Sequence, residues 1–314
     1  MRLSPIHGDG IDFKTSDGKI FKYVGTTEFA LFKRWLMPSG PTHLVLPILE
    51  ERKRIAHEGG YDGPLVARVM RYAAPPNAFA LDPWSYEVRE AGAATGSMPE
   101  VTRFTDFCGE HGWYVDWTCG DSQKIPSVST PDGPRGQQQH LNEFCAALVP
   151  CTNAFVETCN EPFQNGIDVR RIVPPQWGSY LRDSGMYWEH DFWQHDLDLD
   201  FVSFHTRRDE GGQRPWPKFI IDMFDAAADL DTMMLDHHGG RPAVLKEPIG
   251  FDENEIPNRR TNRVDCAGRM GLVIAFCAGV TFHSTPGLAS DGFGPTVTNC
   301  FRNFCRGIAA GLGV

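Results

Sequence analysis

Two glutamates stand where an apolar run ends, and a proline follows each of them. Glu161 comes after the run 154–159, and Glu247 comes after the run 242–246. Proline holds the preceding residue in an extended conformation and cannot donate to a strand ladder, so both glutamates are expected at the end of a pairing strand. Two carboxylates fixed in this way have the chemistry that cleavage of a glycosidic bond requires, one as acid and base and the other as nucleophile.

Other polar and aromatic side chains lie at or near the ends of similar apolar runs and are candidates for contacts with a substrate. They are Asn160, Arg71, Asp116, Trp117, Trp188, His205 and His283. Arg68 is an alternative to Arg71, because their odd separation along a strand lets only one of them face inward. We favour Arg71, which is nearer the end of its run.

The elements that must position these residues alternate between short apolar runs and longer amphipathic stretches, which predicts βα units and a parallel sheet. The predicted strands are 19–27, 64–73, 113–118, 154–159, 186–190, 199–205, 242–247 and 280–284. The predicted helices are 44–57, 99–112, 135–148, 175–184, 217–230, 261–278 and 296–310. A hairpin over 13–19, turning at Asp17-Gly18, is expected to close the barrel floor.

Eight such units in 314 residues predict an α/β protein, one (β/α)8 TIM barrel that spans 1–314 with a short N-terminal β-hairpin. Active sites of such barrels lie at the C-terminal ends of the strands. Side chains from the fourth and seventh strands can meet over the centre, and in retaining glycosidases the two carboxyl groups lie about 5–5.5 Å apart.

Asn160-Glu161-Pro162 at the end of a fourth strand, with Glu247 at the end of a seventh, resembles the large clan of retaining (β/α)8-barrel glycoside hydrolases that includes cellulases, mannanases, β-galactosidases and β-glucuronidases. The resemblance implies that Glu161 is the acid/base and Glu247 the nucleophile. It also implies that Asn160 bonds the sugar 2-hydroxyl.

Further positions carry the same resemblance. His205 is similar to a site histidine after the sixth strand, and Arg68 or Arg71 resembles a second-strand arginine that braces the nucleophile. The chain departs from the family at the eighth strand, where many members have a tryptophan and this sequence has Phe282-His283. The sugar platform is therefore expected at Trp117, Trp188 or Trp193. The implied substrate is a β-linked glycoside or polysaccharide, and the implied reaction needs no cofactor.

Other interpretations remain open. Glu161 could be a helix N-cap, and Glu247 could pair with Lys246 or Arg269. The chain could be a non-catalytic carbohydrate-binding or assembly barrel, for example one encoded by a phage or in a polysaccharide locus, or a barrel similar to metal-dependent sugar isomerases. No metal is predicted, because the sequence lacks H-E-x-x-H and the strand-borne H-x-H of metal-dependent barrels, although 190–196 and His237-His238 hold potential ligands.

Lys246 could in principle form a Schiff base, as in barrel aldolases. Neighbouring residues on a strand face opposite ways. If Glu247 faces the inside of the barrel, Lys246 is expected to point toward the helices, which disfavours that chemistry.

The composition narrows the possible partners and location. A net charge of −10 and a pI of about 5.5 argue against nucleic acid and against an anionic membrane surface as partners, and fit a neutral carbohydrate.

The nine cysteines form no C-x-x-C pair and are expected as buried thiols, with a Cys300–Cys305 disulfide left open. Residues 1–8 lack an apolar signal core, so a cytoplasmic location, or release without Sec export, is expected. The oligomeric state is left unknown.

Overall fold

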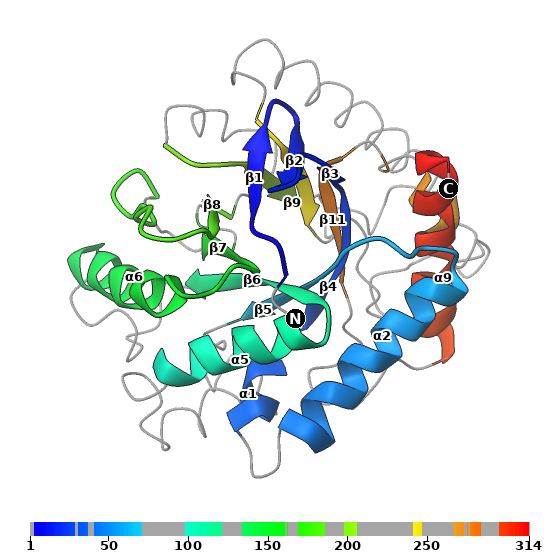
Figure 1. The fold of residues 1–314 in the computed structure, drawn as a ribbon, viewed down its shortest axis with the longest axis horizontal. Helices are drawn as coiled ribbons and strands as arrows, with labels where there is room; N and C mark the ends of the chain where they lie inside the picture. The colour runs from blue at the N-terminus through cyan, green and yellow to red at the C-terminus, as the bar shows by residue number, and fades with distance from the viewer. Residues whose placement is uncertain are drawn as a thin grey trace, which may run out of the picture.

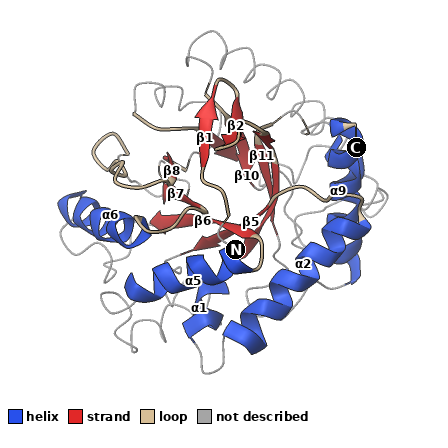
Figure 2. Cartoon of the chain, viewed as in Figure 1, coloured by secondary structure: helices blue, strands red, loops and turns tan. Residues whose placement is uncertain are grey.

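The structure, a computed structural model, describes residues 3–28, 31–36, 41–70, 98–120, 134–160, 162, 169–185, 198–205, 241–246, 267–269, 271–272, 275, 277–283 and 295–313. These residues form a (β/α)8 barrel with the strands inside and the helices outside (Figures 1 and 2). The predicted fold class is therefore confirmed.

Eight parallel strands form one sheet in the order β8-β7-β6-β5-β4-β11-β10-β9. Their bounds are β4 (Tyr23–Glu28), β5 (Leu65–Met70), β6 (Trp113–Gly120), β7 (Ala154–Cys159), β8 (Leu181–Asp183), β9 (Val202–His205), β10 (Ala243–Lys246) and β11 (Gly279–His283). All but β8 lie where the alternation of apolar runs predicts a strand.

The described helices cover the outside of this sheet. They are α1 (Leu31–Leu36), α2 (Leu46–Glu58), which follows a π-helical turn (Pro41–Val45), α5 (Met98–Glu110), α6 (Pro134–Leu148) and α9 (Pro295–Leu312). The helices predicted over 44–57, 99–112, 135–148 and 296–310 are confirmed. Of the helix predicted over 261–278, residues 267–269 and 271–272 are described and helical, whereas residues 275, 277 and 278 are described and are not helical. The helix predicted over 217–230 lies outside the described residues.

The end of α2 shows how glycine stops a helix at a predicted place. Gly59 donates its backbone N–H to the carbonyls of Ile55 and Ala56, and Gly60 adopts a φ of 83°. That left-handed backbone is accessible to glycine without a Cβ clash, so the chain can turn away from the helix axis toward β5.

Strand alternation sorts the side chains onto two faces. The outward residues join the helices in one large core, which includes Val24, Ala67, Val69, Val115, Trp117, Val156, Leu245, Val280 and Phe282. The inward residues nearest the N-terminal ends of the strands form a second, separate core, which includes Tyr23, Val66, Tyr114, Phe155, Leu181, Phe201 and Val244. The barrel interior is therefore filled rather than open at this end.

An antiparallel sheet of β1 (Ile6–Asp9), β2 (Asp12–Thr15) and β3 (Ile20–Phe21) covers the floor of the barrel (Figure 1). Phe13 is fully buried, and its ring centroid lies 5.7 Å from that of Phe155 and 5.4 Å from that of Phe201. The turn between β2 and β3 contains Gly18 at a φ of 79°. The hairpin predicted to close the barrel floor is confirmed, with β1 as an additional strand.

The fifth strand corrects the sequence prediction. We expected a helix over 175–184, but Leu181–Asp183 is strand β8, paired in parallel with β7 through Phe155↔Leu181 and Glu157↔Asp183. Three residues are too few for a periodic signal, and pairing with the open edge of β7 overrides the local preference. The strand predicted over 186–190 lies outside the described residues.

The strands β8 and β9 stand at the two ends of the sheet order and are joined by contacts other than a strand ladder. The backbone N–H groups of Asp200 and Phe201 donate to the carbonyl of Arg182 at 3.0 Å and 3.3 Å. Ser203 Oγ also donates to Asp183 Oδ2. These bonds bring the two end strands together and make the barrel nearly closed.

The eight cysteines that the structure describes are buried as thiols, including Cys300 and Cys305. This confirms the expectation of buried thiols for the described part of the chain. No helix among the described residues is long and apolar enough to cross a membrane.

Candidate active site

A polar layer lies inside the barrel directly above the apolar floor. Because side chains alternate along a strand, the residue two positions after each floor residue also faces inward. Those inward positions hold Gly25, Arg68, Asp116, Glu157, Asp183, Ser203, Lys246 and Thr281. All of these residues are buried, and they lie nearer the C-terminal ends of the strands, where barrel enzymes carry their active sites.

Arg68 and Glu157 form the best-defined pair in this layer. Arg68 Nε donates to Glu157 Oε2 at 2.8 Å, and Arg68 Nη2 donates to Glu157 Oε1 at 2.7 Å. Both side chains have zero exposure to solvent. This bidentate geometry fixes the orientation of the two side chains as well as their separation. A bidentate pair is also stronger than a single charged hydrogen bond.

Lys246 enters the same layer from β10, so the expectation that it points toward the helices is wrong. Its Nζ lies 3.0 Å from Asp116 Oδ2, 3.1 Å from Glu157 Oε2 and 3.1 Å from Asp183 Oδ2. The described part of β10 ends at this lysine, so alternation is not counted beyond it. The direction of the Glu247 side chain therefore stays a prediction.

The charges around Lys246 decide what it can do. Burial alone would lower the pKa of Lys246, but the carboxylates of Asp116, Asp183 and Glu157 together raise it above the usual lysine range. A lysine held as an ammonium is not a nucleophile, so this environment disfavours a Schiff base.

The carboxylates of the layer outnumber its cations. Asp116, Glu157 and Asp183 face only Arg68 and Lys246 among the charged members of the layer. Burial raises the pKa of Asp116, and it raises the pKa of Asp183 to about 7 despite the charge of Lys246. A proton shared among the carboxyl groups would make the layer electrically neutral, because a net charge is costly in a dry interior.

Asn160 connects the polar layer to the C-terminal end of β7. Its backbone N–H donates to the carbonyl of Gly120 at 2.8 Å, and its Oδ1 accepts from Arg68 Nη2 at 2.8 Å. A guanidinium only donates, so this bond fixes which amide atom faces Arg68. The Nδ2 group of Asn160 is thereby directed to other partners. The proposed acid/base, Glu161, is the next residue in the chain.

The structure places only some of the predicted site residues. Glu161, Glu247, Arg71 and Trp188 lie outside the described residues. His205 and His283 are the last residues of β9 and β11, at the predicted end of the barrel, and nothing is described of their side chains. Of the two alternative arginines, Arg68 is the one that the structure shows inside the barrel.

Trp117 is not at the candidate site, which corrects the prediction that it contacts substrate. It lies on the outer face of β6, with zero exposure, and its ring packs against Phe32 at 5.0 Å and Phe104 at 5.3 Å. Its Nε1 donates to Thr105 Oγ1 at 3.0 Å. A side chain enclosed between the sheet and the helices cannot stack on a sugar. Asp116, its neighbour, points into the barrel. It is fully buried beside Lys246 in the polar layer, so its contact is with that lysine.

Glu157, Asp183 and Lys246 were not selected as site residues from the sequence, although a signal for two of them is present. Glu157 and Lys246 are charged residues inside apolar strands. Such a residue in a closed barrel needs a partner of opposite charge, and the interior of the barrel is where strands far apart in sequence supply one. Asp183 lies in the strand that the sequence did not reveal.

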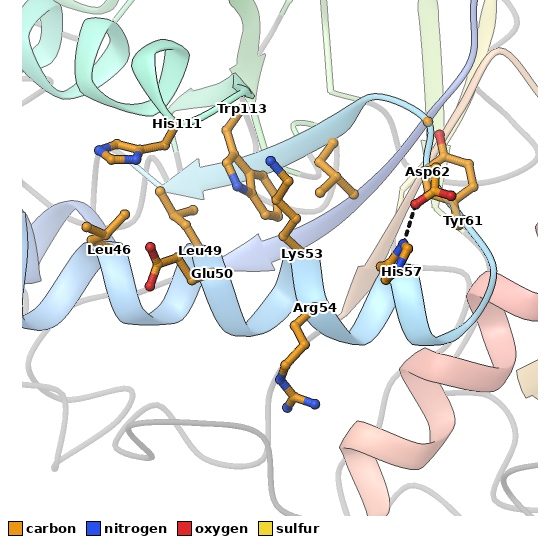
Figure 3. A pocket seen from close by; sticks show the side chains of 12 residues that line it. Leu46, Leu49, Glu50, Lys53, Arg54, His57, Tyr61, Asp62, His111 and Trp113 are labelled. Carbon is orange, nitrogen blue, oxygen red and sulfur yellow. Dashed lines mark hydrogen bonds and ion pairs between the residues drawn. The ribbon is translucent and has the colours of Figure 1, made fainter.

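A groove of about 510 Å³ lies at the other end of the barrel and is distinct from the candidate site (Figure 3). It is lined by residues of α2 such as Lys53 and His57 and by Leu65 and Trp113, the first residues of β5 and β6. His57 Nδ1 and Asp62 Oδ1 lie 2.5 Å apart across its rim. Barrel enzymes place their chemistry at the opposite end, so we assign no reaction to this groove.

Several solved structures share this barrel. A β-mannanase from Streptomyces thermolilacinus with mannohexaose has 12% identity and a TM-score of 0.51, over 98% of this chain and 96% of that chain. The cellulase Cel5C_n has 12% identity and a TM-score of 0.53, over 95% and 87%. A protein from Cytophaga hutchinsonii has 11% identity and a TM-score of 0.55, over 96% and 94%. Identities this low show the fold, and the first two neighbours are glycoside hydrolases.

No protein-family model matches the sequence, and no curated protein matches it significantly.

Proposed function

We propose that the protein is a glycoside hydrolase that cleaves a β-linked glycoside or polysaccharide with retention of configuration. The observation that carries the proposal is the meeting of β7 and β10 inside the barrel, where Lys246 Nζ lies 3.1 Å from Glu157 Oε2. The chain that continues from β7 carries Glu161, and the residue after β10 is Glu247. Two strands whose inward side chains touch are suited to bring carboxylates at their ends within reach of one bond.

The proposed reaction uses these two carboxyl groups in two steps. In the first, the Glu247 carboxylate attacks the anomeric carbon while Glu161 gives its proton to the leaving oxygen, which breaks the glycosidic bond and forms a glycosyl ester on Glu247. In the second, Glu161 accepts a proton from water, the water oxygen attacks the same carbon, and the ester bond breaks. Two inversions restore the starting configuration, and both glutamates return to their initial protonation states.

Asn160 has a supporting role in this proposal. Because Arg68 occupies its Oδ1, the Nδ2 group is the part of the amide that can donate to a sugar hydroxyl. The hydroxyl next to the anomeric carbon is the natural acceptor, since a hydrogen bond there strengthens as the transition state forms.

The structural neighbours suggest which substrates to try first. They include a β-mannanase and a cellulase, so β-mannan and cellulose derivatives come before other polysaccharides in a screen that also contains aryl β-glycosides. The −10 net charge fits a neutral polysaccharide better than a polyanionic one.

The test compares the wild type with Glu161→Gln and Glu247→Gln on this panel, using Glu110→Gln at the exposed end of α5 as the matched control. Each of the two site variants should lose at least about 10²-fold in kcat, and the control should match the wild type. Wild-type turnover by Glu247→Gln would exclude the proposed nucleophile. Binding of an oligosaccharide such as mannohexaose without turnover of any substrate would favour the carbohydrate-binding barrel instead.

A further inference from the structure

We propose that Lys246 is a positioning residue that sets the distance between the two proposed catalytic glutamates, an inference that rests on the proposed function. Lys246 immediately precedes Glu247, and Asn160 immediately precedes Glu161. The residues directly before both glutamates are therefore within the part of the structure that is described.

A continuous chain of buried and half-buried contacts joins these two residues. Lys246 Nζ lies 3.1 Å from Glu157 Oε2, and Glu157 accepts from Arg68 at 2.8 Å and 2.7 Å. Arg68 in turn donates to Asn160 Oδ1 at 2.8 Å. The end of β10 and the end of β7 are thus connected through side chains as well as through the intervening strands.

The Lys246 ammonium is held from several directions. Its three carboxylate partners come from three consecutive strands, with Asp116 on β6, Glu157 on β7 and Asp183 on β8. All four side chains have zero exposure. The ammonium also lies 5.7 Å from the centre of the Phe201 ring. An ion fixed by three partners in a dry interior has little freedom to move, because displacement would leave charges unpaired.

The placement of Lys246 argues against direct contact with substrate. The side chain is fully enclosed within the polar layer and has zero exposure to solvent. Stability alone is also a poor explanation, since apolar side chains of similar volume often serve equally well or better than a buried ion pair. What the ion cluster adds is a defined direction for the backbone that leads into Glu247.

The experiment replaces Lys246 with methionine, which keeps the length of the side chain and removes its charge. Lys53→Met, on the exposed side of α2 at the far end of the barrel, is the matched control. Crystal structures of the wild type and both variants give the separation of the Glu161 and Glu247 carboxyl groups, which needs no knowledge of the substrate. Steady-state kinetics on a substrate that the wild type hydrolyses give kcat and KM separately.

We expect Lys246→Met to change the carboxyl separation by more than about 0.5 Å. We also expect it to lower kcat about 100-fold with little change in KM, because misplacement of reacting groups by about 1 Å has this effect. Lys53→Met should change neither quantity. A folded Lys246→Met protein with the wild-type separation overturns the role of Lys246, whatever its activity. Failure of the wild type to cleave any glycoside tells against the proposed function, and the separation still tests Lys246 on its own.

The double variant Lys246→Met/Asp183→Asn covers the case in which the single variant does not fold. It removes one cation and one carboxylate together, so the formal charge of the layer is the same as in the wild type. A folded double variant with a shifted carboxyl separation supports the positioning role, and one with an unchanged separation overturns it.

Discussion

Lys246 Nζ and Glu157 Oε2 lie 3.1 Å apart inside the barrel, although 89 residues separate them in the chain. The contact joins β10 to β7, the two strands whose C-terminal ends lead to Glu247 and Glu161. It also belongs to a layer of buried charges directly above an apolar floor. This arrangement makes several consequences measurable.

The Arg68–Glu157 pair should be essential to the stability of the barrel. Arg68→Met leaves Glu157 as a buried carboxylate without its bidentate arginine partner. The free energy of unfolding should therefore fall by about 3–5 kcal/mol. Arg103→Met, which breaks an exposed pair with Glu100 on α5, should cost at most about 1 kcal/mol. Urea unfolding of the three proteins measures both effects. Equal losses for the two variants would show that the buried pair contributes no more to the free energy of unfolding than the exposed pair does.

Asn160→Ala should reveal whether the amide contacts the sugar. If its Nδ2 group donates to the hydroxyl beside the anomeric carbon, the variant loses at least about tenfold in kcat/KM on ordinary glycosides, since one such bond contributes more than about 1.4 kcal/mol in the transition state. On matched 2-deoxy glycosides, which lack that hydroxyl, wild type and variant should differ little. A similar loss on both substrates would place the effect elsewhere, for example in the support that Asn160 receives from Arg68.

The polar layer should make stability depend on pH through Asp183. Burial raises its pKa from 3.8 to about 7, so between these values the folded protein holds a proton that the unfolded chain has released. The stability gained from Asp183 is therefore complete below about pH 4 and is lost as the pH rises through about 7. Asp183→Asn cannot titrate at this position. Urea unfolding across this range should show the wild type losing stability relative to the variant as the pH rises, and a constant difference would rule out the shift.

Phe13 tests the role of the N-terminal sheet as the barrel floor. Its ring is fully buried against Tyr23, Phe155 and Phe201, so Phe13→Ala should lower the free energy of unfolding by about 3–5 kcal/mol. Ile20→Ala, in the same sheet but 61% exposed, should change it by less than about 0.5 kcal/mol. Thermal unfolding distinguishes the two. A mild effect at Phe13 would mean that the sheet adds little to the closure of the barrel.

The sequence predicts most of the barrel because its local signals are strong. The run 154–159 is long and apolar, and it is flanked by residues that end strands, so β7 begins and ends where expected. The strand Leu181–Asp183 has no such signal. It is three residues long, and its pairing with β7 depends on a partner strand more than twenty residues earlier in the chain. Tertiary pairing of this kind cannot be inferred from local periodicity.

The sequence predicts a site at the C-terminal ends of the strands, but it does not predict the arrangement of the buried layer beneath. Proline and apolar patterning predict that Glu161 and Glu247 end their strands, and this stays a prediction because both lie outside the described residues. The inward direction of Lys246 does not follow from this patterning, because alternation must be counted from a strand end whose position is uncertain by a residue, and one residue reverses the face. Trp117 was placed on the wrong face for the same reason. Its outward position becomes clear only from contacts with Phe32 and Phe104.

The central claim is that Glu247 forms a covalent link to the sugar and that configuration is retained. The most direct measurement follows the anomeric proton of the first product by NMR, for the wild type and for Glu247→Gln, on a β-glycoside that the wild type cleaves. The account predicts that the β anomer is released first and that the variant is slower by at least about 10²-fold. Initial release of the α anomer, or turnover by Glu247→Gln at the wild-type rate, would contradict it.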